Sequence, residues 1–120
     1  MWLSKQGRTP PRPEETARVG RVTLPDDPAG VWTGSERRDV AVFGPGGYAW
    51  RPAAGEEVLV LKAGEEACLA GVRCTGVPEP GEVWITGPGG SAIRLKSGGV
   101  VDITGTALRF NGAVLAGEVE

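Results

Sequence analysis

Glycine and proline, spread along nearly the whole length, limit what this chain can fold into more than any other feature. Gly 20 and Pro 10 together make 30 of its 120 residues, and no stretch as long as about three turns of α-helix is free of both. A helical bundle is therefore excluded, because glycine and proline are the weakest helix formers. Hydrophobic residues still make up 40% of the chain, too high a share for a disordered polymer. Short strands joined by many tight turns satisfy both facts, so the sequence predicts an all-β protein.

The net charge and the short apolar runs exclude further classes of protein. The formal net charge is -2, which gives no general reason to bind nucleic acid. The longest apolar runs, such as Val58–Leu61, are far shorter than the roughly 20 residues of a membrane-spanning helix. Met1–Pro13 lacks the apolar core of a secretory signal, so we expect synthesis in the cytoplasm without a signal peptide.

Histidine is absent from the chain. Its absence excludes a Ser-His-Asp triad and any metal site built on imidazole. The paired carboxylates of Asp26 and Asp27 lie in a proline-flanked turn, where turn formation and solubility explain them. Two cysteines, Cys68 and Cys74, are too few for a zinc site, and we expect reduced, mostly buried thiols. The sequence thus predicts a protein that is not an enzyme and needs no cofactor or metal.

The first segment, residues 1–18, differs from the rest in composition. It contains three closely spaced prolines and an excess of basic side chains, which is typical of an extended, partly polyproline-like arm. Trp2 and Leu3, at its far end, are candidate docking residues for a partner protein. A solvated tail without a partner is the alternative.

The middle segment, residues 19–78, is predicted to form a small barrel. Apolar and polar residues alternate along it, and turn-forming glycines and prolines separate the alternating runs. A Greek-key barrel of the OB type accommodates such short strands, because closure removes exposed sheet edges. The expected strands are Val19–Leu24, Val31–Thr33, Arg38–Phe43, Glu57–Lys62 and Ala67–Arg73. The expected barrel core or subunit contacts are Val40, Val42, Trp50, Val58 and Val60.

The last segment, residues 79–120, shows a different pattern. Apolar residues come in pairs two positions apart. Glycines separate the pairs, and the pairs repeat about every eight residues. Each pair gives a short strand two inward side chains but no opposite wall, and the segment is too short to form a solenoid alone. Three copies wound together would close a prism, so we predict a homotrimer with a short intertwined triple-stranded β-helix. An antiparallel meander that continues the barrel is the alternative. The predicted shaft core is Val83, Ile85, Ile93, Leu95, Val101, Ile103, Leu108 and Phe110.

Three stretches of the sequence, taken in order, carry a family resemblance that spans most of the chain. Val42–Leu61 contains an aromatic-proline turn followed by Pro-Ala-Ala-Gly-Glu-Glu-Val-Leu-Val-Leu, and Ala70–Val72 follows as a short strand. Pro80–Ile85 and Gly89–Lys96 supply a "G-E-V" and a "G-x-x-I-x-L" pattern. In these stretches the chain resembles the small central spike proteins of contractile phage tails, the baseplate assembly protein V family of Mu-like and P2-like phages.

The resemblance implies a structural, mechanical function. It implies an OB-like barrel followed by a trimeric needle at the centre of the baseplate of a contractile phage tail or phage-derived bacteriocin. Such a needle caps the tube and is driven through the host envelope, so the expected location is the virion baseplate. The implied partners are the other two copies, tail hub and tube proteins, and transiently the host envelope. Members of the family often carry a His-x-His iron tip, which a chain without histidine cannot form, so a separate tip protein is a further possible partner.

An OB-fold binding module for an oligonucleotide or oligosaccharide is the alternative function. Exposed aromatic and basic side chains on such a barrel stack on bases or sugars. The candidates are Trp32, Tyr48, Trp50 and Trp84, with Arg37, Arg38 and Arg51. No strand interleaves these residue types in a row, so the sequence favours the structural function and a protein that does not bind nucleic acid.

Overall fold

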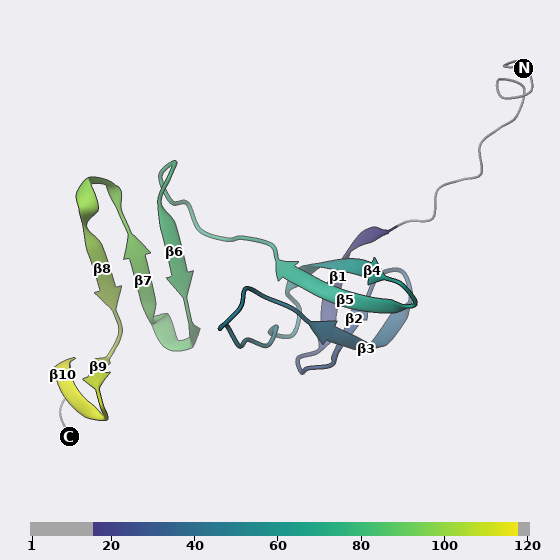
Figure 1. The fold of residues 1–120 in the computed structure, drawn as a ribbon, viewed down its shortest axis with the longest axis horizontal. Helices are drawn as coiled ribbons and strands as arrows, with labels where there is room; N and C mark the ends of the chain where they lie inside the picture. Colours follow the sequence, from purple (N-terminus) through teal and green to yellow (C-terminus); the bar gives the residue numbers. More distant parts are fainter. Residues whose placement is uncertain (1–15, 118–120) are drawn as a thin grey trace, which may run out of the picture. The chain divides into compact units, whose positions relative to one another are not determined.

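The computed structural model describes residues 16–117 and contains, in this range, only β-strands and short 3₁₀ turns. The all-β prediction is confirmed. The chain divides between Cys74 and Thr75 into two units (Figure 1), whereas the sequence placed this boundary after residue 78. Trp2 and Leu3 lie outside the described residues. No helix in the described part is long and apolar enough to cross a membrane.

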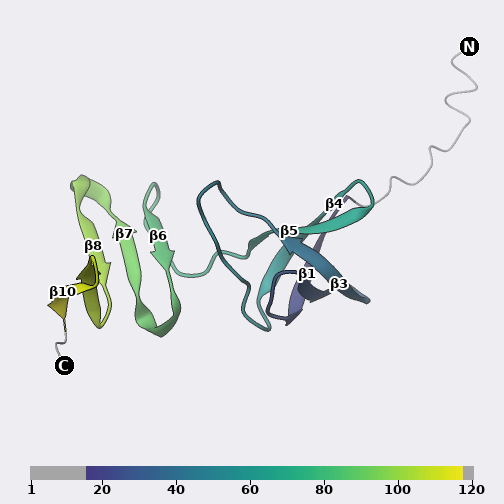
Figure 2. The same ribbon diagram turned by 60° about the horizontal axis from the view of Figure 1, so that its bottom comes forward.

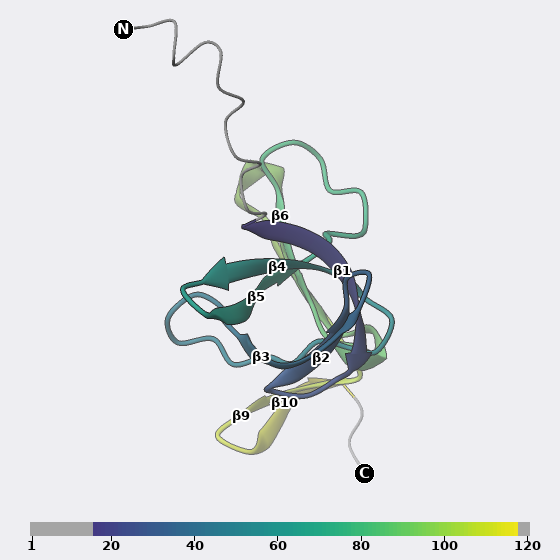
Figure 3. The same cartoon turned by 90° about the vertical axis from the view of Figure 1, so that its right-hand side faces the viewer.

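The first unit is a closed five-stranded barrel, which Figure 3 shows as a ring of strands. Neighbouring strands follow the order β1-β2-β3-β5-β4, and β4 pairs with β1 to close the ring. All neighbours are antiparallel except β3 and β5, which are parallel. The strands are β1 (Ala17–Leu24), β2 (Ala29–Trp32), β3 (Glu36–Val42), β4 (Glu57–Ala63) and β5 (Glu66–Val72).

The barrel strands lie where the sequence placed them, with ends that differ by a few residues. Ala17 and Arg18, assigned to the arm, belong to β1 and pair with Leu61 and Val60 of β4. β2 begins at Ala29, before the apolar run that the sequence used to locate it. The hydrogen-bonded ladder to a neighbouring strand holds residues of low β propensity in these positions.

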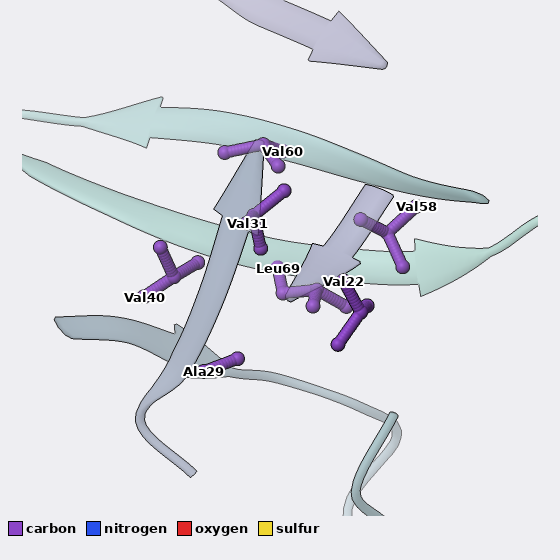
Figure 4. Packing of buried hydrophobic residues seen from close by; sticks show 7 residues of the cluster. All are labelled: Val22, Ala29, Val31, Val40, Val58, Val60 and Leu69. Atoms are coloured by element: carbon purple, nitrogen blue, oxygen red, sulfur yellow. The ribbon is translucent and has the colours of Figure 1, made fainter. Parts of the chain in front are cut away.

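Small aliphatic side chains fill the barrel (Figure 4). Because side chains alternate across a strand, positions two apart on one strand, such as Val58 and Val60, both point inward. Val42 and Trp50 are partly buried and pack against this cluster. The buried cluster is Val22, Ala29, Val31, Val40, Val58, Val60 and Leu69.

The second unit contains two small sheets. One is a three-stranded antiparallel meander in the order β6-β7-β8, and the other is the hairpin of β9 and β10 (Figures 1 and 2). Neither sheet contains a strand of the barrel, so this meander does not continue the barrel. The strands are β6 (Val83–Thr86), β7 (Ala92–Leu95), β8 (Val101–Thr104), β9 (Ala107–Phe110) and β10 (Ala113–Gly117).

Paired glycines form the corners of the meander. The 3₁₀ turns η1 (Pro88–Gly90) and η2 (Ser97–Gly99) connect β6 to β7 and β7 to β8. Each turn ends on two consecutive glycines with φ between 71° and 83°, a region that residues with a Cβ rarely adopt. The glycines that separate the apolar pairs in the sequence therefore set the length of each strand.

Candidate functional site

Six of the eight predicted shaft residues lie on one face of the β6-β7-β8 sheet. Directly paired residues of antiparallel strands point to the same side of a sheet, and residues two apart on one strand do so as well. The six residues, called the apolar face from here on, form two rows across the three strands. The rows are Val83, Leu95 and Val101, and Ile85, Ile93 and Ile103.

The apolar face is exposed in the single chain. The exposed fraction of its residues runs from 41% at Ile93 to 57% at Val101, although large aliphatic side chains are normally buried. A contiguous apolar patch on a soluble protein marks an interaction surface. Within residues 16–117, the sheet therefore lacks the second layer that β-structure needs in order to bury its hydrophobic side.

The opposite face of the same sheet is polar. Arg94 pairs across the strands with Trp84 on one side and Asp102 on the other. The Arg94 guanidinium carbon lies 4.0 Å from the centre of the Trp84 ring, which is a cation–π contact. Lys96 Nζ lies 3.0 Å from Asp102 Oδ2. The chain's own charged side chains thus complete this face, whereas the apolar face has no cover within the described residues.

The carboxylate of Glu82 connects the segment before β6 with the turn after β7. Its Oε1 accepts a hydrogen bond from the Glu79 backbone N–H at 3.1 Å, and its Oε2 accepts one from the Ser97 N–H at 3.4 Å. The Glu79 N–H, more than the Ser97 N–H and the charge of Lys96, lowers the pKa of Glu82 from its ordinary value of 4.5. The charged form of this group therefore holds the end of the sheet together.

We expect acid to weaken the second unit through Glu82. Because its pKa is lowered by folding, the unfolded chain binds the proton more tightly, so the carboxylate stabilises the fold above about pH 4.5 and this contribution is lost as the pH falls further. Glu82→Gln is expected to lower the melting temperature near neutral pH, and the difference from the natural chain is expected to vanish in acid. Thermal melts across this range measure it, with Glu65→Gln as the control. A constant difference at all pH values would contradict the assignment.

Leu108 and Phe110, the last predicted shaft pair, lie apart from the apolar face. They occupy β9, which pairs with β10 and not with β8, and they are 40% and 63% exposed. The repeat in the sequence gives the spacing of strands but not their partners. It therefore did not distinguish the meander from the hairpin that follows it.

Of the residues considered for an oligonucleotide- or sugar-binding face, only Tyr48, Trp50 and Arg51 come together, along one groove. Trp32 lies on β2 and is 52% exposed, whereas Tyr48 and Trp50 lie in the segment between β3 and β4, and Trp84 belongs to the second unit. Arg38 on β3 pairs with Glu36, the Nε to Oε2 distance being 3.0 Å. Within residues 16–117, no strand carries an aromatic and basic row of the kind that stacks on a nucleic acid.

Thiols and acidic groups are also dispersed. Among the described residues, no three His, Cys, Asp or Glu side chains gather in a way that could hold a metal ion. Both cysteines are free, with Cys68 buried and Cys74 exposed. The expectation that both thiols are mostly buried is therefore wrong for Cys74, which lies beyond the end of β5, where the chain leaves the barrel.

Sequence reasoning missed the polar face of the meander. The signal was present, because Trp84, Arg94 and Asp102 each occupy the position between two residues of a predicted apolar pair. Side-chain alternation alone places them together on the opposite face once the strands are in register. The role of Glu82 carried no such signal, since it depends on the shape of the turn at Ser97.

A scan of the chain against models of protein families finds no match. A search of curated proteins likewise finds none.

Proposed function

We propose that this protein is the trimeric central spike of a contractile phage tail or phage-derived bacteriocin, a needle that caps the tube and punctures the host envelope. The apolar face is the observation that carries the proposal. Three copies of the meander, each turning this face toward a common axis, form the walls of a closed prism. The chain's resemblance to the baseplate spike family supports three copies rather than two.

The free energy of covering the apolar face favours assembly. Full burial of a large aliphatic side chain contributes about 1.5–3 kcal/mol. Because each of the six residues is roughly half exposed, covering them adds roughly 1 kcal/mol each and on the order of 5 kcal/mol per chain. This gain is comparable to the whole stability of a small domain, so it strongly favours assembly over the single chain.

The shape of the meander also suits a needle under axial load. Each strand contributes only two residues to the apolar face, so three such narrow sheets meet along a thin core with no space for solvent. Backbone hydrogen bonds between β6, β7 and β8 tie successive levels of a wall together. The polar face, with Arg94 and Asp102, then points to water on the outside of the prism.

The barrel is consistent with the same proposal. We infer that it is of the OB type, because its strands follow the order β1-β2-β3-β5-β4 with β3 parallel to β5. In a spike it contacts the tail hub and tube proteins. The alternative of an oligonucleotide- or sugar-binding module is weaker, since Trp32 and Trp84 lie on other elements and Arg51, beside Tyr48 and Trp50, is already paired with Asp26. Adding oligonucleotide is therefore expected to leave the tryptophan fluorescence unchanged.

Location in the particle tests the function directly. An antibody against the chain, applied to contractile-tail particles purified from cells that make the protein, is expected to label the tube end at the centre of the baseplate. Electron microscopy of negatively stained particles measures the label position, with an antibody against the sheath as the control. Label along the sheath would contradict the proposal, and so would purified particles that carry no label.

A further inference from the structure

A groove lies beside the segment that joins β3 to β4 in the first unit. Its volume is about 490 Å³. The groove opens at the surface, and aromatic side chains form part of its wall. Its lining residues are Asp27, Val42, Gly44, Tyr48, Ala49, Trp50 and Arg51.

The aromatic wall of the groove is held in place by the chain itself. Trp50 Nε1 donates a hydrogen bond to the Phe43 carbonyl oxygen at 3.0 Å. The indole also lies against the backbone of Gly44, where an added Cβ would lie 2.8 Å from Nε1. Tyr48, in contrast, is 63% exposed. The groove thus offers one fixed ring and one accessible ring on which an apolar ligand group can pack.

The groove contains one open carboxylate. Asp27 Oδ1 accepts a hydrogen bond from the Val42 backbone N–H at 3.1 Å, and within residues 16–117 Asp27 makes no ion pair. The cation in the lining, Arg51, has a partner already, because its Nη1 lies 3.4 Å from Asp26 Oδ1. A ligand that brings a positive charge next to aromatic-packing groups fits this arrangement.

A proline-rich segment with a basic residue is a ligand of this chemistry. Such segments adopt the polyproline helix before binding and dock in aromatic-lined grooves at a low entropic cost. This chain carries one in the order Arg-Thr-Pro-Pro-Arg-Pro, at residues 8–13. The six residues hold two positive charges and no negative one, so they complement Asp27.

The segment cannot occupy the groove of its own barrel. The three-residue connection from Pro13 to Thr16 can span no more than about 10 Å. β1 starts at Ala17, spans eight residues and is about 25 Å long, and the groove lies beyond its far end. In Figures 1 and 2 the connection between β3 and β4 lies at the other end of the barrel from the start of β1.

We propose that the groove at Asp27, Tyr48 and Trp50 binds residues 8–13 of a second copy of this chain. The proline rings pack on Tyr48 and Trp50, and an arginine of the segment pairs with Asp27. This contact ties barrels of different copies together. It lies in the barrel unit and adds to an assembly that the apolar face holds together, without holding copies together by itself.

A peptide-binding experiment tests this contact. The probe is a dye-labelled peptide of residues 6–15, and the receptor is the full chain with Pro10→Ala, Pro11→Ala and Pro13→Ala, whose own segment competes less. Fluorescence anisotropy is expected to show saturable binding, which Tyr48→Ala weakens by roughly tenfold. Asp27→Asn is expected to weaken it by about five- to tenfold. Trp32→Ala, which removes another exposed aromatic residue of the barrel, is the matched control.

The outcomes separate this proposal from the proposed spike. Loss of binding in Tyr48→Ala and Asp27→Asn, with Trp32→Ala unaffected, supports the contact whether the receptor is a monomer or a trimer. Binding unchanged by Tyr48→Ala, equal loss in Trp32→Ala, or equal binding of a peptide whose prolines are replaced by alanine overturns it. No saturable binding at all overturns it too. The mass of the assembly is a separate measurement, and it tests the apolar face.

Discussion

Ile93→Asp is expected to convert the assembled protein into monomers. Ile93 lies at the middle of the apolar face, on the central strand β7, with Ile85 and Ile103 as its paired neighbours. In a three-walled prism the substitution brings three carboxylates together at the axis, away from water. Burial of unpaired charge costs at least about 4 kcal/mol, which lowers the association constant by roughly a thousandfold or more.

The control for this variant carries the same charge on the other face of the same sheet. Thr104 on β8 is exposed and pairs with Ala92, so Thr104→Asp is expected to leave the assembly intact. Light scattering after gel filtration compares the two variants, and circular dichroism checks that the strands remain. Since Ile93 is 41% exposed in the single chain, Ile93→Asp is expected to keep its fold as a monomer. An Ile93→Asp protein with the mass of the natural assembly would show that this residue faces solvent.

Leu69→Ala is expected to cause the largest loss of stability in the barrel. Leu69 lies on β5 and is 0% exposed, within a cluster otherwise made of valine and alanine side chains. Replacement by alanine removes three carbons and leaves a cavity that small neighbours cannot fill, at a cost of about 2–5 kcal/mol. Hydrogen exchange of peptides from β4 and β5 is expected to accelerate at least roughly thirtyfold, because the core strands exchange through unfolding.

The matched control removes the same atoms from the outside of the barrel. Leu59 on β4 is 42% exposed and pairs with Gly71 of β5. Leu59→Ala is expected to change the same exchange rates by less than about tenfold, since it opens no cavity. Equal effects of the two substitutions would contradict the placement of Leu69 inside the barrel and of Leu59 outside it.

The sequence was sufficient to predict an all-β fold and most of its strands. Alternation at Val58 and Val60 reports which side of a strand is buried, and the glycines at residues 98 and 99 report where a strand must end. Strand ends were less accurate, as at Ala17, because pairing with β4 decides them. Which strands become neighbours depends on contacts distant in the chain, and local patterns do not contain that information.

Most of the candidate site also followed from the sequence. The pairs at Ile85, Ile93 and Ile103 were recognised as one set, and the structure brings them onto one face. Leu108 and Phe110 were grouped with them by spacing alone, although β9 turns to a different partner. The Trp84 and Arg94 stack and the groove at Tyr48 were not expected, because each joins side chains whose proximity depends on register or on the course of an irregular segment.

The central claim is that three copies of this chain close their apolar faces against one another. The mass of the natural protein in solution tests it most directly, measured by light scattering after gel filtration at micromolar concentration. The claim predicts three times 12.5 kDa. A particle of 12.5 kDa, or one of twice that mass, would contradict it.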